Sequence, residues 1–256
     1  MIKSTPKISI AMTYYDRLSL LKETLHSISL HTWPDEIIIV DDGSLREPLD
    51  EVIIKDISCD MNVIMHRIQP ELKTWINSCI PFNKAFSLCT GDVIIIQNAE
   101  CWHRDDIVDY CKNTILMNDN NYLVFGCYSL PKNANLSRDR ILNDRSVTFD
   151  GDDAWYQHSI YRPVCYHFTT AISRNTLMKL RGFDENYADG TAYEDNEFLY
   201  RVKRITNVIQ VDSHIVFHQN HYNAHSKNTE YNAKTNLSKF QALSQYDNYT
   251  GFKSSL

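Results

Sequence analysis

The feature that most constrains the fold is a regular alternation of short apolar segments with helical patterns along the first half of the chain. The apolar segments are hydrophobic throughout, which is typical of strands buried on both faces. They predict strands at 8–12, 36–40, 62–66, 92–97 and 122–128. Helices are predicted between them, at 18–30, 49–57, 82–89 and 105–117. The alternation predicts an α/β fold whose sheet is flanked by helices.

The second half of the chain is less regular. The stretch 131–163 is polar and predicts a lid or binding loop. Helices at 174–180 and 194–203 and short strands at 207–211 and 214–217 follow. We therefore expect one domain over 1–222, with a nucleotide-binding half at 1–130 and a second half at 131–222. The segment 223–256 is expected to be a C-terminal tail or a peripheral helix.

Composition excludes several classes of protein. The chain has 256 residues, 43% of them hydrophobic, which is enough for a full core. Its net charge of -6, without a block of like charges, disfavours nucleic-acid binding. The 7 cysteines form no Cys-x-x-Cys pair, so a zinc knuckle is disfavoured and reduced thiols in the cytoplasm are expected. No apolar run approaches the about 20 residues of a transmembrane segment.

Acidic residues directly follow the second predicted strand, as Asp41-Asp42-Gly43-Ser44. Carboxylates at the end of a buried strand are costly unless something uses them. Ligands of open α/β sheets bind at the carboxyl ends of strands, where an Asp can accept a hydrogen bond from a base or a ribose. Gly43 lets the backbone turn close to such a ligand. The alternative is a simple Asp-Gly turn.

Polar side chains also follow the fourth predicted strand. Asn98 and Glu100 are two residues apart, so on an extended chain they point the same way. A hard divalent cation such as Mn²⁺ or Mg²⁺ takes oxygen ligands and bridges diphosphate oxygens. The pair is therefore a candidate metal site, and the alternative is a turn with a solvated Glu.

Two further candidates lie near the end of the chain. Glu194 and Asp195 begin a predicted helix, where acidic residues are favourable for electrostatic reasons alone. Their functional interpretation is a general base that deprotonates an acceptor hydroxyl. His218 and His221 follow the last predicted strand and could supply an imidazole to a metal. The chain has 10 histidines, so this pair is not diagnostic by itself.

The order and spacing of these motifs are more specific than any one of them. The relevant segments are Ile10 to Arg17, Asp41-Asp42-Gly43-Ser44, Asn83-Lys84-Ala85 with Gly91-Asp92, Gly182-Phe183-Asp184-Glu185 and Glu194-Asp195. Together they resemble the GT-A fold glycosyltransferases of the large family 2 type, over roughly 8–221. The C-terminal segment is also similar to β-galactosyl- and N-acetylgalactosaminyl-transferases, including bacterial chondroitin-type polymerases. The resemblance implies a GT-A (Rossmann-like) mixed, mostly parallel sheet flanked by helices.

The resemblance also implies roles for individual residues. A UDP-sugar would be bound by Thr13, Tyr14 or Tyr15, Asp41, Asp42, Arg67 and Asn98. Mn²⁺ or Mg²⁺ would be coordinated by Glu100 and His218, with His221 as the alternative. Asp195 would be the general base, and Glu194 would bind a sugar hydroxyl. The sequence departs from the family in one respect, because Asn98-Ala99-Glu100 stands where an Asp-x-Asp motif is usual.

The implied reaction is an in-line displacement that inverts the anomeric configuration. It would move a hexose of the galactose or glucose type from the UDP-sugar to a hydroxyl of a glycan or glycoconjugate. Trp155, Tyr156, His158 and Arg162 would lie on a mobile loop over the acceptor, because closing loops exclude water. The alternative for Trp155 is a hydrophobic anchor of that loop.

The sequence leaves two other functions open. A nucleotidyltransferase also combines an α/β sheet with a metal, but the chain lacks a Gly-rich, basic phosphate loop near its N-terminus. A non-catalytic glycan- or nucleotide-binding module derived from a GT-A enzyme is favoured by Asn98. The retention of Glu100, Asp195 and His218 argues against this second alternative.

Overall fold

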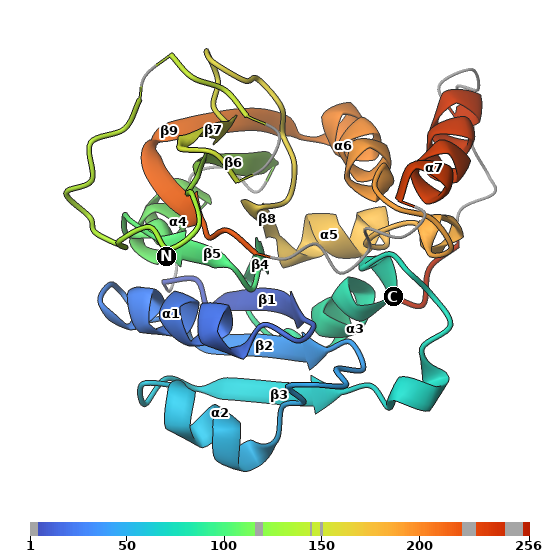
Figure 1. Cartoon of the computed structure of the whole chain (residues 1–256). Coiled ribbons are helices and arrows are strands. Elements are labelled where there is room, and N and C mark those ends of the chain that lie inside the picture. Colours follow the sequence, from blue (N-terminus) through green and yellow to red (C-terminus); the bar gives the residue numbers. More distant parts are fainter. Residues whose placement is uncertain (1–4, 116–119, 144, 149–150, 222–228, 244–252) are drawn as a thin grey trace.

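A computed structural model describes residues 5–115, 120–143, 145–148, 151–221, 229–243 and 253–256 of the chain (Figure 1). The strands are β1 (Ile8–Tyr14), β2 (Glu36–Asp41), β3 (Val63–Arg67), β4 (Val93–Asn98), β5 (Cys101–His103), β6 (Asn121–Ser129), β7 (Ala154–Gln157), β8 (Thr169–Ser173) and β9 (Asn207–His218). The α-helices are α1 (Leu18–Ser29), α2 (Glu51–Ile57), α3 (Cys79–Leu88), α4 (Ile107–Ile115), α5 (Arg174–Leu180), α6 (Glu194–Ile205) and α7 (Thr229–Leu243). Short 3-10 helices lie at η1 (Pro70–Leu72) and η2 (Glu185–Tyr187).

The described strands form one mixed sheet in the order β3-β2-β1-β4-β8-β6-β9-β5, and β7 pairs with β6. Strands β3, β2, β1 and β4 are parallel. Strand β8 runs antiparallel between β4 and β6, whereas β9 is parallel to β6 and antiparallel to β5. The predicted α/β class with a mixed sheet is confirmed, and its continuous run of four parallel strands comes from the first half of the chain.

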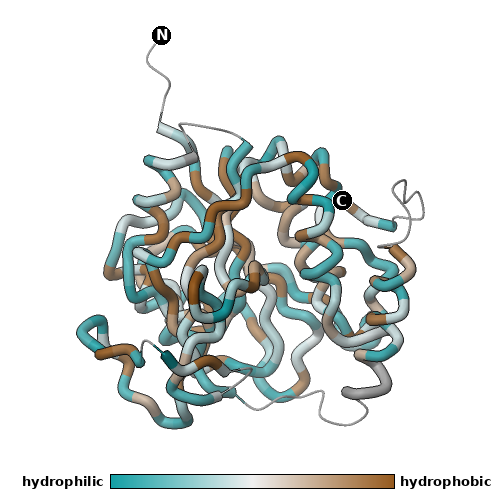
Figure 2. The backbone as a smooth tube through the Cα atoms, turned by 90° about the horizontal axis from the view of Figure 1, so that it is seen from above, coloured by the Kyte–Doolittle hydropathy of each residue, from teal (hydrophilic) through white to brown (hydrophobic). Residues whose placement is uncertain are grey.

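Helices cover both faces of the sheet because successive side chains of a buried strand point to opposite sides. Ile37 and Ile39 of β2 belong to a core with residues of α1, α2 and α4. Ile38 and Val40 belong to the opposite core, with residues of α3, α5 and α6. Figure 2 shows that hydrophobic stretches run through the middle of the molecule.

Several details differ from the sequence-based expectations. The polar stretch 131–163 contains strand β7, which was not predicted. The two expected strands at 207–211 and 214–217 are one strand, β9, with a register shift opposite Phe125 and Gly126. Strand β5 was also missed, because its three residues are too few to show a periodicity. None of the described helices is long and apolar enough to cross a membrane.

The described residues after 222 pack on the segment that precedes α6. Asn236 of α7 is fully buried, and its side-chain amide donates to the carbonyls of Tyr187 and Ala192. The backbone of Lys253 exchanges hydrogen bonds with Asp184 and Glu185. Helix α7 thus contacts the part of the chain that leads into the acidic pair.

Candidate functional site

A cavity of about 580 Å³ opens at the carboxyl ends of β1, β2 and β4 and at the start of α6. It lies where ligands of α/β sheets bind. The predicted site residues that line it are Thr13, Tyr14, Tyr15, Asp42, Asn98, Glu100, Tyr156, Arg162, Glu194 and Asp195. The fold therefore brings most of the predicted site residues to one cavity.

One wall of the cavity is built around Asp42. Its carboxylate accepts a hydrogen bond from Trp75 Nε1 at 2.8 Å and forms an ion pair with Lys73. The Lys73 ammonium also lies 4.8 Å from the ring centroid of Tyr15. Burial raises the pKa of Asp42 above its ordinary value, although Lys73 opposes this shift. Sequence reasoning missed Lys73 and Trp75, because the irregular segment that carries them has no motif.

Asp41 does not line the cavity, contrary to its predicted role in binding uridine. Its side chain is fully buried and accepts hydrogen bonds from the backbone N–H groups of Ser44 (2.8 Å) and Leu49 (2.9 Å). Arg67 does not line the cavity either, and its Nε lies 3.8 Å from Asp41. Asp41 thus shapes the turn, in which Gly43 adopts a φ of 76°. The next residue, Asp42, lines the cavity instead.

Tyr14 has its ring in the hydrophobic core, and its hydroxyl donates to the carbonyl of Glu47 at 2.6 Å. Its neighbour Tyr15 is only partly buried and lies beside Lys73. Tyr14 also lines the cavity, but it is only 1% exposed. Tyr15 is the residue of this pair that is available to a ligand.

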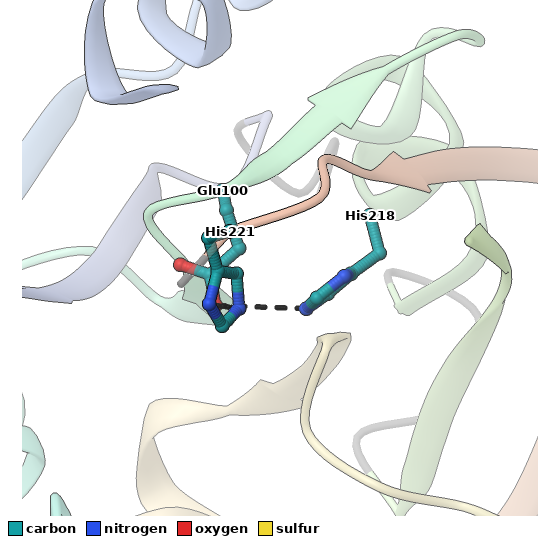
Figure 3. A group of neighbouring side chains, drawn as sticks. All are labelled: Glu100, His218 and His221. Atoms are coloured by element: carbon teal, nitrogen blue, oxygen red, sulfur yellow. Dashed lines mark ion pairs between the residues drawn. The ribbon is translucent and has the colours of Figure 1, made fainter. Parts of the chain in front are cut away.

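Three metal-capable side chains converge beside the cavity. The carboxylate of Glu100 and one nitrogen of each of His218 and His221 lie within 4.8 Å of one another (Figure 3). The Nε2 atoms of His218 and His221 are 3.6 Å and 3.3 Å from Glu100 Oε1. Pairing of β5 with β9 sets this geometry, because it places Cys101 opposite His218. Gln219 reinforces it by donating to the carbonyl of Glu100.

Glu100 is almost fully buried but remains a carboxylate. Burial alone would raise its pKa. The guanidinium of Arg17, 2.9 Å from Oε1, and the two histidines outweigh burial and hold the pKa well below its usual range. A carboxylate with two imidazole nitrogens suits Mn²⁺ better than Mg²⁺, which prefers an all-oxygen shell. Asn98 lines the same cavity.

The acidic pair also lines the cavity. Glu194 is the first residue of α6, and its Oε2 accepts a hydrogen bond from Asn77 Nδ2 at 2.5 Å. Burial raises the pKa of Asp195 well above its ordinary value, and the neighbouring Glu194 adds to the shift. Burial also raises the pKa of Glu194. Asp195 is therefore a stronger base than an exposed carboxylate.

The turn before this pair is strained. Ala192 and Tyr193 both have positive φ, at 60° and 69°, which is rare for residues with a side chain. Such strain persists only where the surroundings enforce it, and it clusters at functional sites. Here Asn236 holds the carbonyl of Ala192 at 2.9 Å, and the ring of Tyr193 stacks on Phe240.

The predicted acceptor loop divides into two groups. Tyr156 and Arg162 line the cavity, and the Arg162 guanidinium lies 5.1 Å from the Tyr156 ring centroid. Trp155 does not, because it precedes Tyr156 on strand β7 and points to the opposite face. It is only 3% exposed and packs among Tyr128, Phe217 and other residues of a separate core. The structure corrects its predicted role and supports the anchor alternative.

His167 lines the cavity and was missed by sequence reasoning, because no motif surrounds it. Its ring packs against Phe82 and Phe183, with centroids 5.1 Å and 5.0 Å away. Burial lowers its pKa to about 4, so the imidazole is neutral at physiological pH. Its Nδ1 is buried and has no hydrogen-bond partner among the described residues.

Comparisons with known proteins indicate the family and the fold of the chain. Residues 9–181 match the family model described as Glycosyl transferase family 2. No curated protein matches the chain by sequence. The match ends before the acidic pair and the two histidines, so their assignment depends on the structure.

Solved structures show what the fold is similar to. GalNAc-T7 with UDP, GalNAc and Mn²⁺ is 17% identical, with a TM-score of 0.69 over 94% of this chain and 48% of that chain. TarS from S. aureus is 13% identical, with a TM-score of 0.60 over 83% of this chain and 60% of that chain. The mannosyltransferase PcManGT from Pyrobaculum calidifontis, in complex with GDP-Man and Mn²⁺, is 12% identical. Its TM-score is 0.63 over 96% of this chain and 66% of that chain. The chain thus has the GT-A fold, and it spans about half the length of the GalNAc-T7 chain.

Proposed function

Because the chain belongs to glycosyl transferase family 2, we propose that it transfers a hexose of the galactose or glucose type from a UDP-sugar. The acceptor is a hydroxyl group of a glycan or glycoconjugate, and the anomeric configuration is inverted. Mn²⁺ is the preferred cation, with Mg²⁺ as the alternative. One observation carries this proposal: Glu100, which belongs to the metal-capable group, and the acidic pair Glu194 and Asp195 line one cavity.

The donor occupies the side of the cavity formed by the ends of β1, β2 and β4. Asp42 and Tyr15 hold the base there, and Thr13 and Asn98 lie on the adjacent strand ends. Two of the similar structures contain a sugar nucleotide or UDP together with Mn²⁺, which supports the donor class. The neutral ring of His167 borders the same cavity.

Glu100, His218 and His221 would hold the cation. A bound cation supplies positive charge that stabilises the departing diphosphate. Asp195 accepts the proton of the attacking acceptor hydroxyl, and its raised pKa suits this task. Glu194, fixed by Asn77, binds a hydroxyl of the acceptor sugar. Tyr156 and Arg162 cover the cavity and limit the access of water to the donor.

A non-catalytic binding module is the second candidate, and one observation favours it. Asn98 replaces the first acidic residue of the usual Asp-x-Asp motif, which removes a charge beside the cation. Such a module would bind UDP with Mn²⁺ without transferring a sugar.

A panel of UDP-sugars separates the two candidates. We would measure UDP release with and without Mn²⁺, for the wild type and for Asp195→Asn, with simple glycosides as acceptors. The transferase predicts Mn²⁺-dependent release from one donor and its loss in the variant. Release from no donor, combined with calorimetric binding of UDP and Mn²⁺, would support the binding module. If UDP does not bind at all, the nucleotide site assigned to Asp42 and Glu100 is wrong.

A further inference from the structure

The cationic side chain nearest to the metal-capable group is Arg17. Its Nη1 lies 2.9 Å from Glu100 Oε1, the same oxygen that the Nε2 atoms of His218 and His221 approach. Three groups therefore share one carboxylate oxygen. A divalent cation at this oxygen would lie next to the guanidinium, and two positive charges at such a distance repel each other.

The backbone of the loop between β1 and α1 directs Arg17 toward Glu100. Asp16 adopts a positive φ of 49°, and its Oδ1 accepts hydrogen bonds from the backbone of Arg46 and Glu47. Its own N–H donates to Ser44 Oγ at 3.0 Å. These contacts tie the loop to the turn that follows β2. The Arg17 side chain is 25% exposed, so it retains room to move within the cavity.

A nucleotide diphosphate needs more positive charge than one divalent cation supplies. The cationic side chains among the described residues of the cavity wall are Arg17, Lys73 and Arg162. Lys73 pairs with Asp42, and Arg162 donates to the carbonyl of Tyr156 at 2.6 Å. Arg17 is the one beside the metal-capable group, and a guanidinium binds phosphate oxygens in a bidentate manner.

We propose that Arg17 binds the diphosphate of the donor, and that a divalent cation at Glu100 displaces it into this role. This inference rests on the proposed function, because it takes the donor and its cation as given. Arg17 and the cation compete for Glu100, whereas Arg17 and the diphosphate attract each other. Removing the charge of Arg17 must then strengthen the binding of the cation and weaken the binding of the diphosphate.

The test is calorimetry on the wild type and on Arg17→Met, which removes the charge at similar volume. With MnCl₂ alone, we expect the variant to bind Mn²⁺ about tenfold more tightly, because the carboxylate is no longer shared. With UDP at saturating Mn²⁺, we expect it to bind about 10- to 100-fold more weakly. Uridine lacks the diphosphate, so its affinity should be equal in both proteins.

Two further variants serve as controls. Lys22→Met removes one positive charge from the exposed face of α1, the helix that follows Arg17, at a site 3.9 Å from Asp56, and should change neither affinity. Arg17→Lys keeps the charge but loses the planar fork. It should bind Mn²⁺ as the wild type does and lose only part of the affinity for UDP. It also preserves the test if Arg17→Met does not fold.

The possible outcomes are distinct. Unchanged or weaker Mn²⁺ binding in Arg17→Met overturns the inference, as does unchanged UDP binding. An equal loss of uridine and UDP affinity also overturns it, since Arg17 would then act on the base. A wild-type chain that binds neither Mn²⁺ nor UDP overturns the proposed function and this inference with it. Opposite shifts for Mn²⁺ and UDP support the inference.

Discussion

At the scale of single residues, the acidic pair shows how burial sets reactivity. Glu194 and Asp195 are adjacent, and burial raises the pKa of both carboxyl groups. A carboxylate held in this way is a better base than one in water, but the folded protein keeps it at a cost in stability. Activity and stability are therefore expected to respond in opposite directions to the loss of the charge.

Asp195→Asn tests this opposition. Loss of the base should lower kcat by about 10²- to 10⁴-fold. Because the pKa of Asp195 is raised in the folded state, its stabilising contribution is present at low pH and is lost as the pH rises through that pKa. The variant should therefore melt about 2–4 °C higher than the wild type at pH 8. The difference should shrink as the pH falls, and a difference that grows instead would contradict the assignment. The melting temperatures of the wild type and the variant are compared over about three pH units, from about pH 5 to about pH 8.

Trp155 and Tyr156 form a second residue-scale test, because neighbours on one strand face opposite sides. Trp155→Ala should lower the free energy of unfolding by about 3–5 kcal/mol, since it leaves a cavity beside Tyr128 and Tyr161. Tyr156→Ala should instead raise the acceptor KM, with a much smaller loss of stability. Urea denaturation and transfer kinetics on both variants separate the two roles. A rise in acceptor KM without destabilisation in Trp155→Ala would restore its predicted role.

At the scale of elements, helix α7 determines where the acidic pair lies. Asn236 binds the carbonyls of Tyr187 and Ala192, and Gly190 packs so closely on it that a Cβ would lie 2.3 Å from its side chain. Phe240 covers the ring of Tyr193. These contacts hold the strained turn that begins α6, so α7 acts on Asp195 through the backbone.

Asn236→Ala should therefore lower kcat by about tenfold to 100-fold, because small displacements of a catalytic group cost rate. The affinity for UDP and Mn²⁺ should not change, since the hydrogen bonds of the Asn236 amide go to Tyr187 and Ala192 and not to the donor-binding residues. Ser238→Ala is the matched control, because that hydroxyl bonds only within its own helix in the described contacts. Stopped-time transfer assays and calorimetry provide the two readouts. Equal losses of kcat and UDP affinity would indicate general damage to the fold instead of a positioning role.

At the scale of the whole molecule, one sheet joins the two halves of the chain. Strand β4 of the first half pairs with β8, and β5 pairs with β9. The edge of β4 and the faces that α5 and α6 cover would be exposed in an isolated first half. The nucleotide side and the acceptor side are thus expected to unfold together.

A fragment of residues 1–130 should consequently fail to fold alone. We expect narrow amide dispersion in its NMR spectrum and no cooperative thermal transition, whereas the full chain should show one transition. Two separate transitions in the full chain, or a folded fragment that binds UDP, would show that the halves are independent domains.

The sequence by itself determined the parts of the protein that depend on local pattern. Continuous apolar runs such as 36–40 and 92–97 predict buried strands, and the polar residues after them must lie at the carboxyl edge of the sheet. That rule was enough to place Asp42, Asn98 and Glu100 at the cavity. The helical pattern at 194–203 likewise placed Glu194 and Asp195 at a helix start.

Only the tertiary structure decided which of these residues meet. Pairing of β5 with β9 brings His218 to Glu100, and strand order is set by long-range packing that no local pattern encodes. The direction of a side chain on a short strand is also undetermined locally, which is why Trp155 and Asp41 were assigned to the cavity. Lys73 and Arg17 reach it from irregular loops, and Trp75 holds Asp42 from one of these loops. The course of such loops depends on hydrogen bonds to distant segments. Local periodicity determines which segments become helices and strands, whereas contacts between residues far apart in sequence determine which side chains meet in the site.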